Sequence, residues 1–182
     1  GGNHIRYNQI NGAYYMGIQS QYQRNIDVIG NRIWVNPAYT SSYGLYMVYT
    51  DSARIERNNI NNFAVYGMYL QTLNYQFGSG TYRSTIVNNM VGGRSSGASP
   101  YGIYLAATVP GSAYLNIFHN SVSVNSGATG AAFFLQQTTS GQFNEIDVRN
   151  NSFANFGTGA YSCYFYFSVA IPNLTVNYNN YY

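Results

Sequence analysis

Charged side chains are scarce in this sequence. Asp, Glu, Lys and Arg make up 7% of its 182 residues, against about 25% in an average soluble domain, and lysine is absent. The eight basic residues are arginines scattered along the chain, and the formal net charge is only +3. A nucleic-acid-binding protein needs a clustered basic stripe, so we expect no nucleic-acid partner.

Cysteine and long apolar runs are also scarce. The single cysteine, Cys163, has no partner for an internal disulfide, and we expect it to pack as a buried thiol. No apolar run reaches the roughly 18 residues that a membrane-spanning helix requires, so we expect no membrane insertion. Tyrosine (21 residues), glycine (19 residues) and asparagine are abundant instead, which predicts a surface made of phenols, hydroxyls and amides.

An internal repeat runs through the chain. An apolar residue or Thr, two further residues, Asn, one residue and an apolar residue recur seven times. The repeated asparagines are Asn8, Asn31, Asn58, Asn88, Asn120, Asn151 and Asn179. Their spacings of 23, 27, 30, 32, 31 and 28 residues are typical of a solenoid whose loops vary in length. Asn tolerates the left-handed backbone conformation of a sharp turn, so we expect each coil to bend at this residue.

A second motif falls between successive asparagines. It has the form Tyr-Gly-Leu-Tyr-Met at Tyr43, Tyr-Gly-Met-Tyr-Leu at Tyr66 and Tyr-Gly-Ile-Tyr-Leu at Tyr101. These segments alternate with period 2, which is typical of β-strands and not of helices. The two motifs together predict an all-β fold for residues 1–182, a right-handed parallel β-helix (solenoid) of about six coils with three short strands in each.

Stacking of the coils at about 4.8 Å places equivalent residues above one another. We therefore expect the seven asparagines to form a buried ladder of amide hydrogen bonds. One core wall is predicted from Ile10, Ile33, Ile60, Met90, Val122, Phe153 and Tyr181. A second is predicted from Ile18, Leu45, Met68, Ile103, Phe133 and Cys163. The coil ending at Asn88 fits badly, because its register turns Arg83 inward and Ile86 outward, and we expect a bulge or an insertion there.

The alternation of a Gly-Ile-Tyr-Leu strand with an Asn-x-Ile turn resembles the parallel β-helix repeats of the pectin-lyase-like superfamily, over nearly the whole chain. The lysine-free, Tyr- and Asn-rich style and the closing segment 173–182 are similar to large surface proteins exported by type IX secretion systems. This resemblance implies an extracellular or cell-surface location. Because both ends would leave a core uncovered, we expect residues 1–182 to be one segment that continues into further coils of a longer chain.

An outward column of rings is the main candidate for a binding surface. It comprises Tyr46, Tyr69, Tyr104, Phe134 and Tyr164. Rings stacked at the coil spacing can stiffen a sheet. They can also form a platform for sugar rings or for another protein. The sequence leaves both explanations open.

Groups for catalysis are few. The resemblance implies that an enzyme of this superfamily would carry acids, bases or Ca²⁺-binding carboxylates on the outward face of the Gly-x-Tyr-x strand or its loops, and this chain has none in that column. Glu145 and Asp147 lie two residues apart on one face and are weak candidates for a cation site. His119 has no second His or Cys nearby, and Asp27 should stack between His4 and Arg54. We expect no cofactor and no metal.

The sequence favours a non-catalytic structural or adhesive β-helix segment of a secreted or cell-surface protein. Its expected partner is a polysaccharide or another surface protein, bound through the aromatic column. The alternative is part of a carbohydrate-active enzyme, a polysaccharide lyase or glycoside hydrolase, whose active site lies in loops or outside this segment. Fold alone does not choose between the two.

Overall fold

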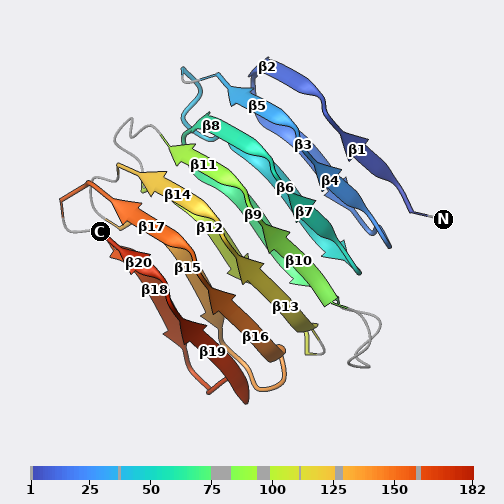
Figure 1. The fold of residues 1–182 in the computed structure, drawn as a ribbon, viewed down its shortest axis with the longest axis vertical. Helices are drawn as coiled ribbons and strands as arrows, with labels where there is room; N and C mark the ends of the chain where they lie inside the picture. Colours follow the sequence, from blue (N-terminus) through green and yellow to red (C-terminus); the bar gives the residue numbers. More distant parts are fainter. Residues whose placement is uncertain are drawn as a thin grey trace.

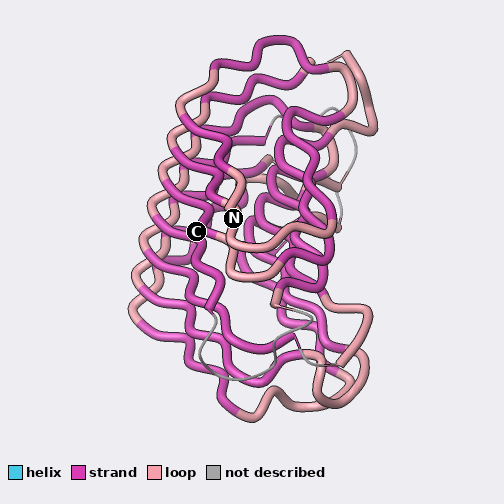
Figure 2. The backbone as a smooth tube through the Cα atoms, turned by 90° about the vertical axis from the view of Figure 1, so that its right-hand side faces the viewer, coloured by secondary structure: helices cyan, strands magenta, loops and turns pink. Residues whose placement is uncertain are grey.

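The chain winds into a parallel β-helix with three sheets (Figure 1). The computed structural model describes residues 2–36, 38–74, 83–93, 99–110, 112–125, 129–158 and 161–182. Every strand pairs in parallel with the equivalent strand one coil away, and each coil passes through sheets A, B and C in turn. The tube in Figure 2 shows these coils stacked along one axis. The described residues contain strands, turns and bends but no helix, and so no helix among them crosses a membrane.

The strands divide evenly among the sheets. Sheet A contains β1 (His4–Arg6), β4 (Asp27–Ile29), β7 (Arg54–Glu56), β10 (Arg83–Val87), β13 (Ser112–Phe118), β16 (Phe143–Arg149) and β19 (Asn173–Asn177). Sheet B contains β2 (Gln9–Ala13), β5 (Arg32–Val35), β8 (Asn59–Phe63), β11 (Met90–Gly93), β14 (Ser121–Val124), β17 (Ser152–Asn155) and β20 (Asn180–Tyr181). Sheet C contains β3 (Met16–Gln21), β6 (Tyr43–Thr50), β9 (Tyr66–Leu73), β12 (Tyr101–Ala106), β15 (Ala131–Gln137) and β18 (Tyr161–Phe167).

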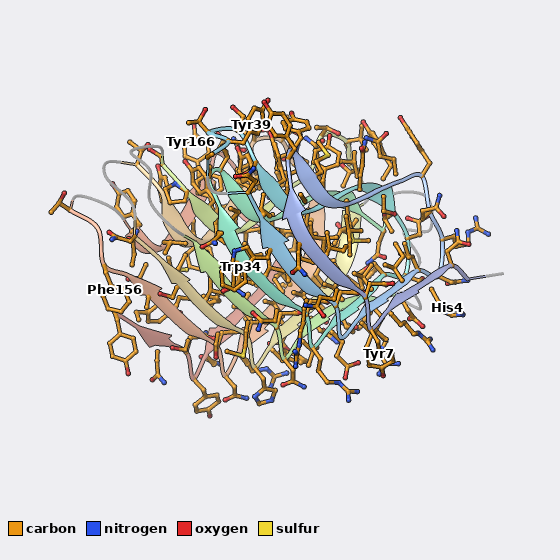
Figure 3. The ribbon with its side chains drawn as sticks, turned by 90° about the horizontal axis from the view of Figure 1, so that it is seen from above. His4, Tyr7, Trp34, Tyr39, Phe156 and Tyr166 are labelled. Carbon is orange, nitrogen blue, oxygen red and sulfur yellow. The ribbon has the colours of Figure 1, made fainter. Side chains whose placement is uncertain are left out.

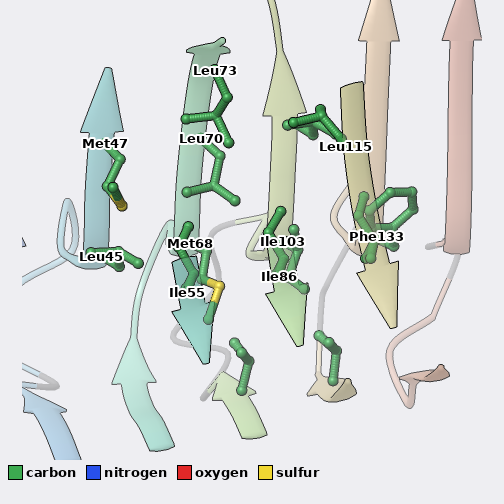
Figure 4. Packing of buried hydrophobic residues seen from close by; sticks show 14 of the residues in the cluster. Leu45, Met47, Ile55, Met68, Leu70, Leu73, Ile86, Ile103, Leu115 and Phe133 are labelled. Carbon is green, nitrogen blue, oxygen red and sulfur yellow. The ribbon is translucent and has the colours of Figure 1, made fainter. Parts of the chain in front are cut away.

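The predicted architecture is confirmed: six sets of three strands are followed by β19 and β20 of a further coil. The period-2 pattern has its expected physical cause, since β5 and β14 alternate strictly between exposed and buried side chains. The buried residues of all three sheets meet in one continuous apolar core (Figure 4). Each coil buries one inward column from each sheet against the next coil, and this burial of apolar surface stabilises the stack.

An asparagine ladder lies at the corner between sheets A and B. The Nδ2 of Asn31 donates to Oδ1 of Asn58 at 2.9 Å, and the Nδ2 of Asn58 donates to Oδ1 of Asn89 at 3.0 Å. The ladder consists of Asn8, Asn31, Asn58, Asn89, Asn120, Asn151 and Asn179. Each acceptor oxygen also receives the backbone N–H of the preceding ladder residue. The corner amides are thereby satisfied within the protein.

The assignment of Asn88 to this ladder is wrong, because the ladder residue of that coil is its neighbour Asn89. Asn88 is exposed, whereas Asn89 is buried. The ladder spacing on either side of Asn89 is then 31 residues. Two consecutive asparagines made the sequence pattern ambiguous, and the wrong choice displaced the coil by one residue.

That one-residue displacement explains the other misplaced residues of the coil. A shift by one moves each strand residue to the opposite face. Met90 is 60% exposed, and Val91 fills the core column in its place. Ile86 is fully buried, and β10 pairs with its neighbours in regular register, without the expected bulge or insertion. Thr81, where the misfitting segment began, lies outside the described residues.

In six of the seven corners the left-handed residue also differs from the expected one, and Asn88 is the expected residue that does adopt this conformation. The left-handed residue precedes the ladder asparagine, with φ between 54° and 66° in all seven coils. These residues are Tyr7, Gly30, Arg57, Asn88, His119, Asn150 and Tyr178. The ladder asparagine itself points inward, where its amide holds the coils together.

Candidate functional site

The outward column of rings forms a continuous stack on sheet C. Strand register pairs Tyr46 with Tyr69, Tyr69 with Tyr104, and Tyr104 with Phe134. Their ring centroids are 5.1, 5.2 and 5.0 Å apart, and the ring planes differ by 4°, 4° and 11°. Tyr164 ends the row with an edge contact to Phe134 at 5.2 Å. The structure therefore brings together all five residues that the sequence placed in this column.

A second row of rings lies beside the first. Tyr66 stacks on Tyr43 at 5.1 Å and on Tyr101 at 5.5 Å. It also meets the edges of Tyr69 and Tyr104 at 5.0 and 5.1 Å. The sequence interpretation missed this row, although the tyrosine that precedes the glycine in each Tyr-Gly-x-Tyr motif was its signal.

In the strands that carry the two rows of rings, a glycine follows each tyrosine of the second row. A Cβ atom at Gly67 would lie 2.5 Å from the carbonyl oxygen of Gly102, and one at Gly44 would lie 2.6 Å from that of Gly67. Such distances are below van der Waals contact, so this column accepts only residues that permit the close approach of neighbouring coils. Ala132 occupies the same column one coil later.

The rings of this array bury much of one another's surface. Phe134 is only 7% exposed, and Tyr46, Tyr69, Tyr104 and Tyr164 are half-buried. A sugar that stacks on an aromatic residue needs an open ring face, whereas the faces here lie against neighbouring rings. The hydroxyl of Tyr104 donates to Oε1 of Gln136 at 2.6 Å. The geometry of the column thus fits the stiffening role better than the platform role.

Burial keeps the phenols of this array neutral. Desolvation, assisted by repulsion from neighbouring phenolates, raises the pKa of Tyr43 and of Tyr104 to about 12. The pKa values of Tyr66, Tyr69 and Tyr101 are raised for the same reason. These groups can donate and accept hydrogen bonds near neutral pH, but they are poorly suited to act as bases.

The two candidate carboxylates for a cation site are both engaged by arginines. Glu145 forms an ion pair with Arg83, which also donates to Oδ1 of Asn116 at 3.2 Å. Asp147 accepts a hydrogen bond from Nε of Arg149 at 2.6 Å. A guanidinium beside each carboxylate supplies the charge that a cation would otherwise provide, so this pair does not fit a metal site.

The remaining acids are engaged in the same manner. The register confirms that Asp27 lies between His4 and Arg54, and Asp27 pairs with His4 at 3.0 Å and with Arg6. Burial alone would raise its pKa, but these partners outweigh burial and the net pKa is lowered. Glu56 accepts hydrogen bonds from Arg54 and Arg57, each at 2.7 Å, and its pKa is lowered likewise. The fifth acid, Asp51, is buried at a backbone bridge with Arg24.

The isolated His119 and Cys163 do not form a reactive site. His119 lies at a corner beside Asn120, in a polar hollow lined by asparagine, serine and tyrosine side chains. Cys163 packs against the core, and its burial raises the pKa of the thiol to about 12, which keeps it protonated and unreactive.

A known protein family matches most of the chain. The family model described as periplasmic copper-binding protein (NosD) matches residues 1–149. Neither the curated proteins nor the solved structures contain a match.

The family description implies copper, and a copper site would have to be built from the donor groups of this chain. Copper is bound by imidazole, thiolate and thioether groups. The chain contains two His, one Cys and four Met; His4 is on β1, His119 is at a later corner, and Cys163 is on β18. Met47 and Met68 are fully buried in the core. Throughout the part of the chain that the structure describes, no three His, Cys, Asp or Glu side chains gather in a metal-binding group.

These residues do not fit a copper centre. The match nevertheless covers residues 1–149 of 182, and the parallel β-helix is the architecture that the sequence repeat predicts. By this match, the chain belongs to the NosD family of periplasmic copper-binding proteins.

Proposed function

We propose that this chain is a non-catalytic structural or adhesive segment of an exported protein. One observation carries the proposal: four of the five carboxylates of the sequence are bound to arginine, and the fifth is buried. Hydrolysis or elimination in a polysaccharide needs an acid and a base with tuned pKa values held close together. The pKa values of Asp27 and Glu56 are lowered, because their arginine partners outweigh burial, and this makes both carboxylates poor general acids near neutral pH. Glu145 and Asp147 are each paired with an arginine.

Export is supported by the periplasmic description of the family. The finer location on the cell surface, by a type IX secretion system, rests on the style of the sequence. A surface of phenols, amides and hydroxyls with few charges suits a protein that makes broad contacts outside the cytoplasm.

The ring rows of sheet C give the segment its stiffness in this proposal. The first row carries a ring in five successive coils, from Tyr46 to Tyr164, and the second row in three, from Tyr43 to Tyr101. Each stacked pair contributes about 0.5–1.5 kcal/mol beyond simple burial. A glycan or a protein that contacts sheet C would meet ring edges and hydroxyls. The alternative, a lyase or hydrolase with its catalytic groups in loops or in other coils, would leave the same stiff rod as its scaffold.

Product formation separates these two functions. The purified chain is incubated with uronate-containing and neutral polysaccharides, and reducing ends and unsaturated products are measured. We expect no product above that of a heat-denatured sample. A product that forms with the parent chain and disappears in a Glu145→Gln, Asp147→Asn double variant, but persists in the matched Asp27→Asn variant, would establish the enzyme instead.

A further inference from the structure

The outer face of sheet B carries a trough that the aromatic column does not involve. Strand register aligns two outward columns across the coils. The first contains Gln9, Arg32, Asn59, Met90, Ser121 and Ser152. The second contains Asn11, Trp34, Asn61, Gly92, Ser123 and Ala154.

Two hollows join to make this trough. One, with a volume of about 270 Å³, is lined by Arg32 and Trp34 together with neighbouring amides. The other, of about 280 Å³, continues from it through the shared residues Asn59 and Asn61 and ends at Phe156. The trough crosses the six strands from β2 to β17, which corresponds to about 24 Å at the spacing of adjacent strands. That length accommodates several sugar units of one linear chain.

Small residues create the depth of the trough. The surface of a sheet usually carries β-branched and aromatic side chains, but the floor here contains Gly92, Ser121, Ser123 and Ala154. Larger side chains also line it: Trp34 is 52% exposed and Phe156 is 71% exposed towards the two ends, and Met90 is 60% exposed between them. Figure 3 shows Phe156 reaching away from the ribbon.

The free groups of the trough differ from those of sheet C. The indole of Trp34 is exposed and stacks on no ring among the described residues, so part of it is available to a ligand. The side chains of Gln9 and Asn11 have no hydrogen-bond partner among the described residues, while Asn61 donates to Asn59 at 2.5 Å. Amides both donate and accept hydrogen bonds, and sugar hydroxyls do the same.

The positive charge of Arg32 favours acidic ligands over neutral ones. Arg6, Arg54, Arg57, Arg83 and Arg149 all pair with carboxylates. The guanidinium of Arg32, by contrast, forms no ion pair within the described ranges, and its column neighbours Gln9 and Asn59 are neutral. No acidic residue lines either hollow, so a carboxylate or sulfate on a ligand would meet an unopposed positive charge.

We propose that this trough binds a linear acidic glycan. Trp34 stacks on a sugar ring, the amides of Gln9, Asn11 and Asn59 bond its hydroxyls, and Arg32 pairs with its acidic group. Apolar surface lines the trough together with amides and hydroxyls, and the unpaired guanidinium of Arg32 beside the amides favours an acidic glycan as its occupant. The inference rests on the proposed non-catalytic contact function and places the glycan on sheet B instead of on the ring rows.

The single tryptophan of the chain makes the test direct, because all of its indole fluorescence comes from Trp34. The probes are a hexamer of uronic acid units and its carboxyl-reduced neutral counterpart. We expect the acidic hexamer to produce a saturable shift of the emission and to bind up to about fivefold more tightly than the neutral one. Arg32→Gln should abolish that preference without abolishing binding of the neutral hexamer.

Calorimetry with variants locates the bound hexamer. Trp34→Ala should weaken binding about tenfold, and Trp34→Phe should restore part of the affinity. The matched control, Thr175→Ala on the exposed face of sheet A, should bind as the parent does. An unchanged Kd in Trp34→Ala, or no emission shift with either hexamer, would contradict glycan binding in the trough. Cleavage of the hexamer would contradict the non-catalytic proposal but would be compatible with glycan binding in the trough.

Discussion

Tyr69 stacks on Tyr104 with ring centroids 5.2 Å apart and ring planes only 4° apart. The two residues are directly paired across β9 and β12, so the stack follows from the strand register itself. Because the rise of one coil is close to the distance between stacked rings, each coil can add one ring to the row without distortion. Stiffness is thereby built into the repeat.

A double-mutant cycle measures this stack. Tyr69→Leu and Tyr104→Leu remove the ring contact and keep an apolar side chain in each place. We expect a coupling free energy of about 1 kcal/mol between the two substitutions in chemical denaturation. Tyr69→Leu combined with Tyr22→Leu, whose ring stacks on Tyr49 instead, serves as the control and should be additive. If the effects of Tyr69→Leu and Tyr104→Leu are additive, the stacked rings do not stabilise the sheet through their contact.

Alkaline titration tests the burial of the phenols. Burial raises the pKa of Tyr43 and of Tyr104 to about 12, so folding favours their neutral form. Their contribution to stability is complete below the ordinary pKa of about 10 and is lost as the pH rises from there towards 12. Tyrosinate absorbance of the native chain should therefore lag behind that of the urea-unfolded chain. Superimposable titration curves would show that these rings are open to water.

The glycine column predicts a sharp contrast between two substitutions. Gly67→Ala places a methyl group 2.5 Å from the carbonyl oxygen of Gly102 and against Val91. We expect it to lower the free energy of unfolding by about 3 kcal/mol. Gly92→Ala points outward, where only Oδ1 of Asn61 lies within 4 Å, at 3.0 Å, and should change stability by less than about 1 kcal/mol. Equal effects in urea denaturation would argue against the close approach of the coils.

The sequence was sufficient for the architecture, and its failures have physical causes. A repeated apolar position fixes which face is buried, so the columns through Ile33, Ile60 and Val122 were predictable. The doublet Asn88-Asn89 satisfied the motif in two registers, and only the hydrogen bonds from Asn58 and to Asn120 select the second.

The trough on sheet B was not predicted, because its floor consists of small residues that carry no periodic apolar signal in a sequence. Trp34 and Phe156 lie 122 positions apart, and they share one surface only after the coils have been stacked. The ion pairs were equally hidden, since Arg83 and Glu145 lie on strands separated by β13.

Every surface assignment depends on the ladder register, and Asn89 tests it most directly. Asn89→Ala removes the acceptor of Asn58 and the donor to Asn120, all buried, and should lower the free energy of unfolding by about 3 kcal/mol. Asn88→Gly, at an exposed left-handed position with φ of 57°, should leave it nearly unchanged. A large loss in Asn88→Gly with little loss in Asn89→Ala would contradict the register and every face assigned from it.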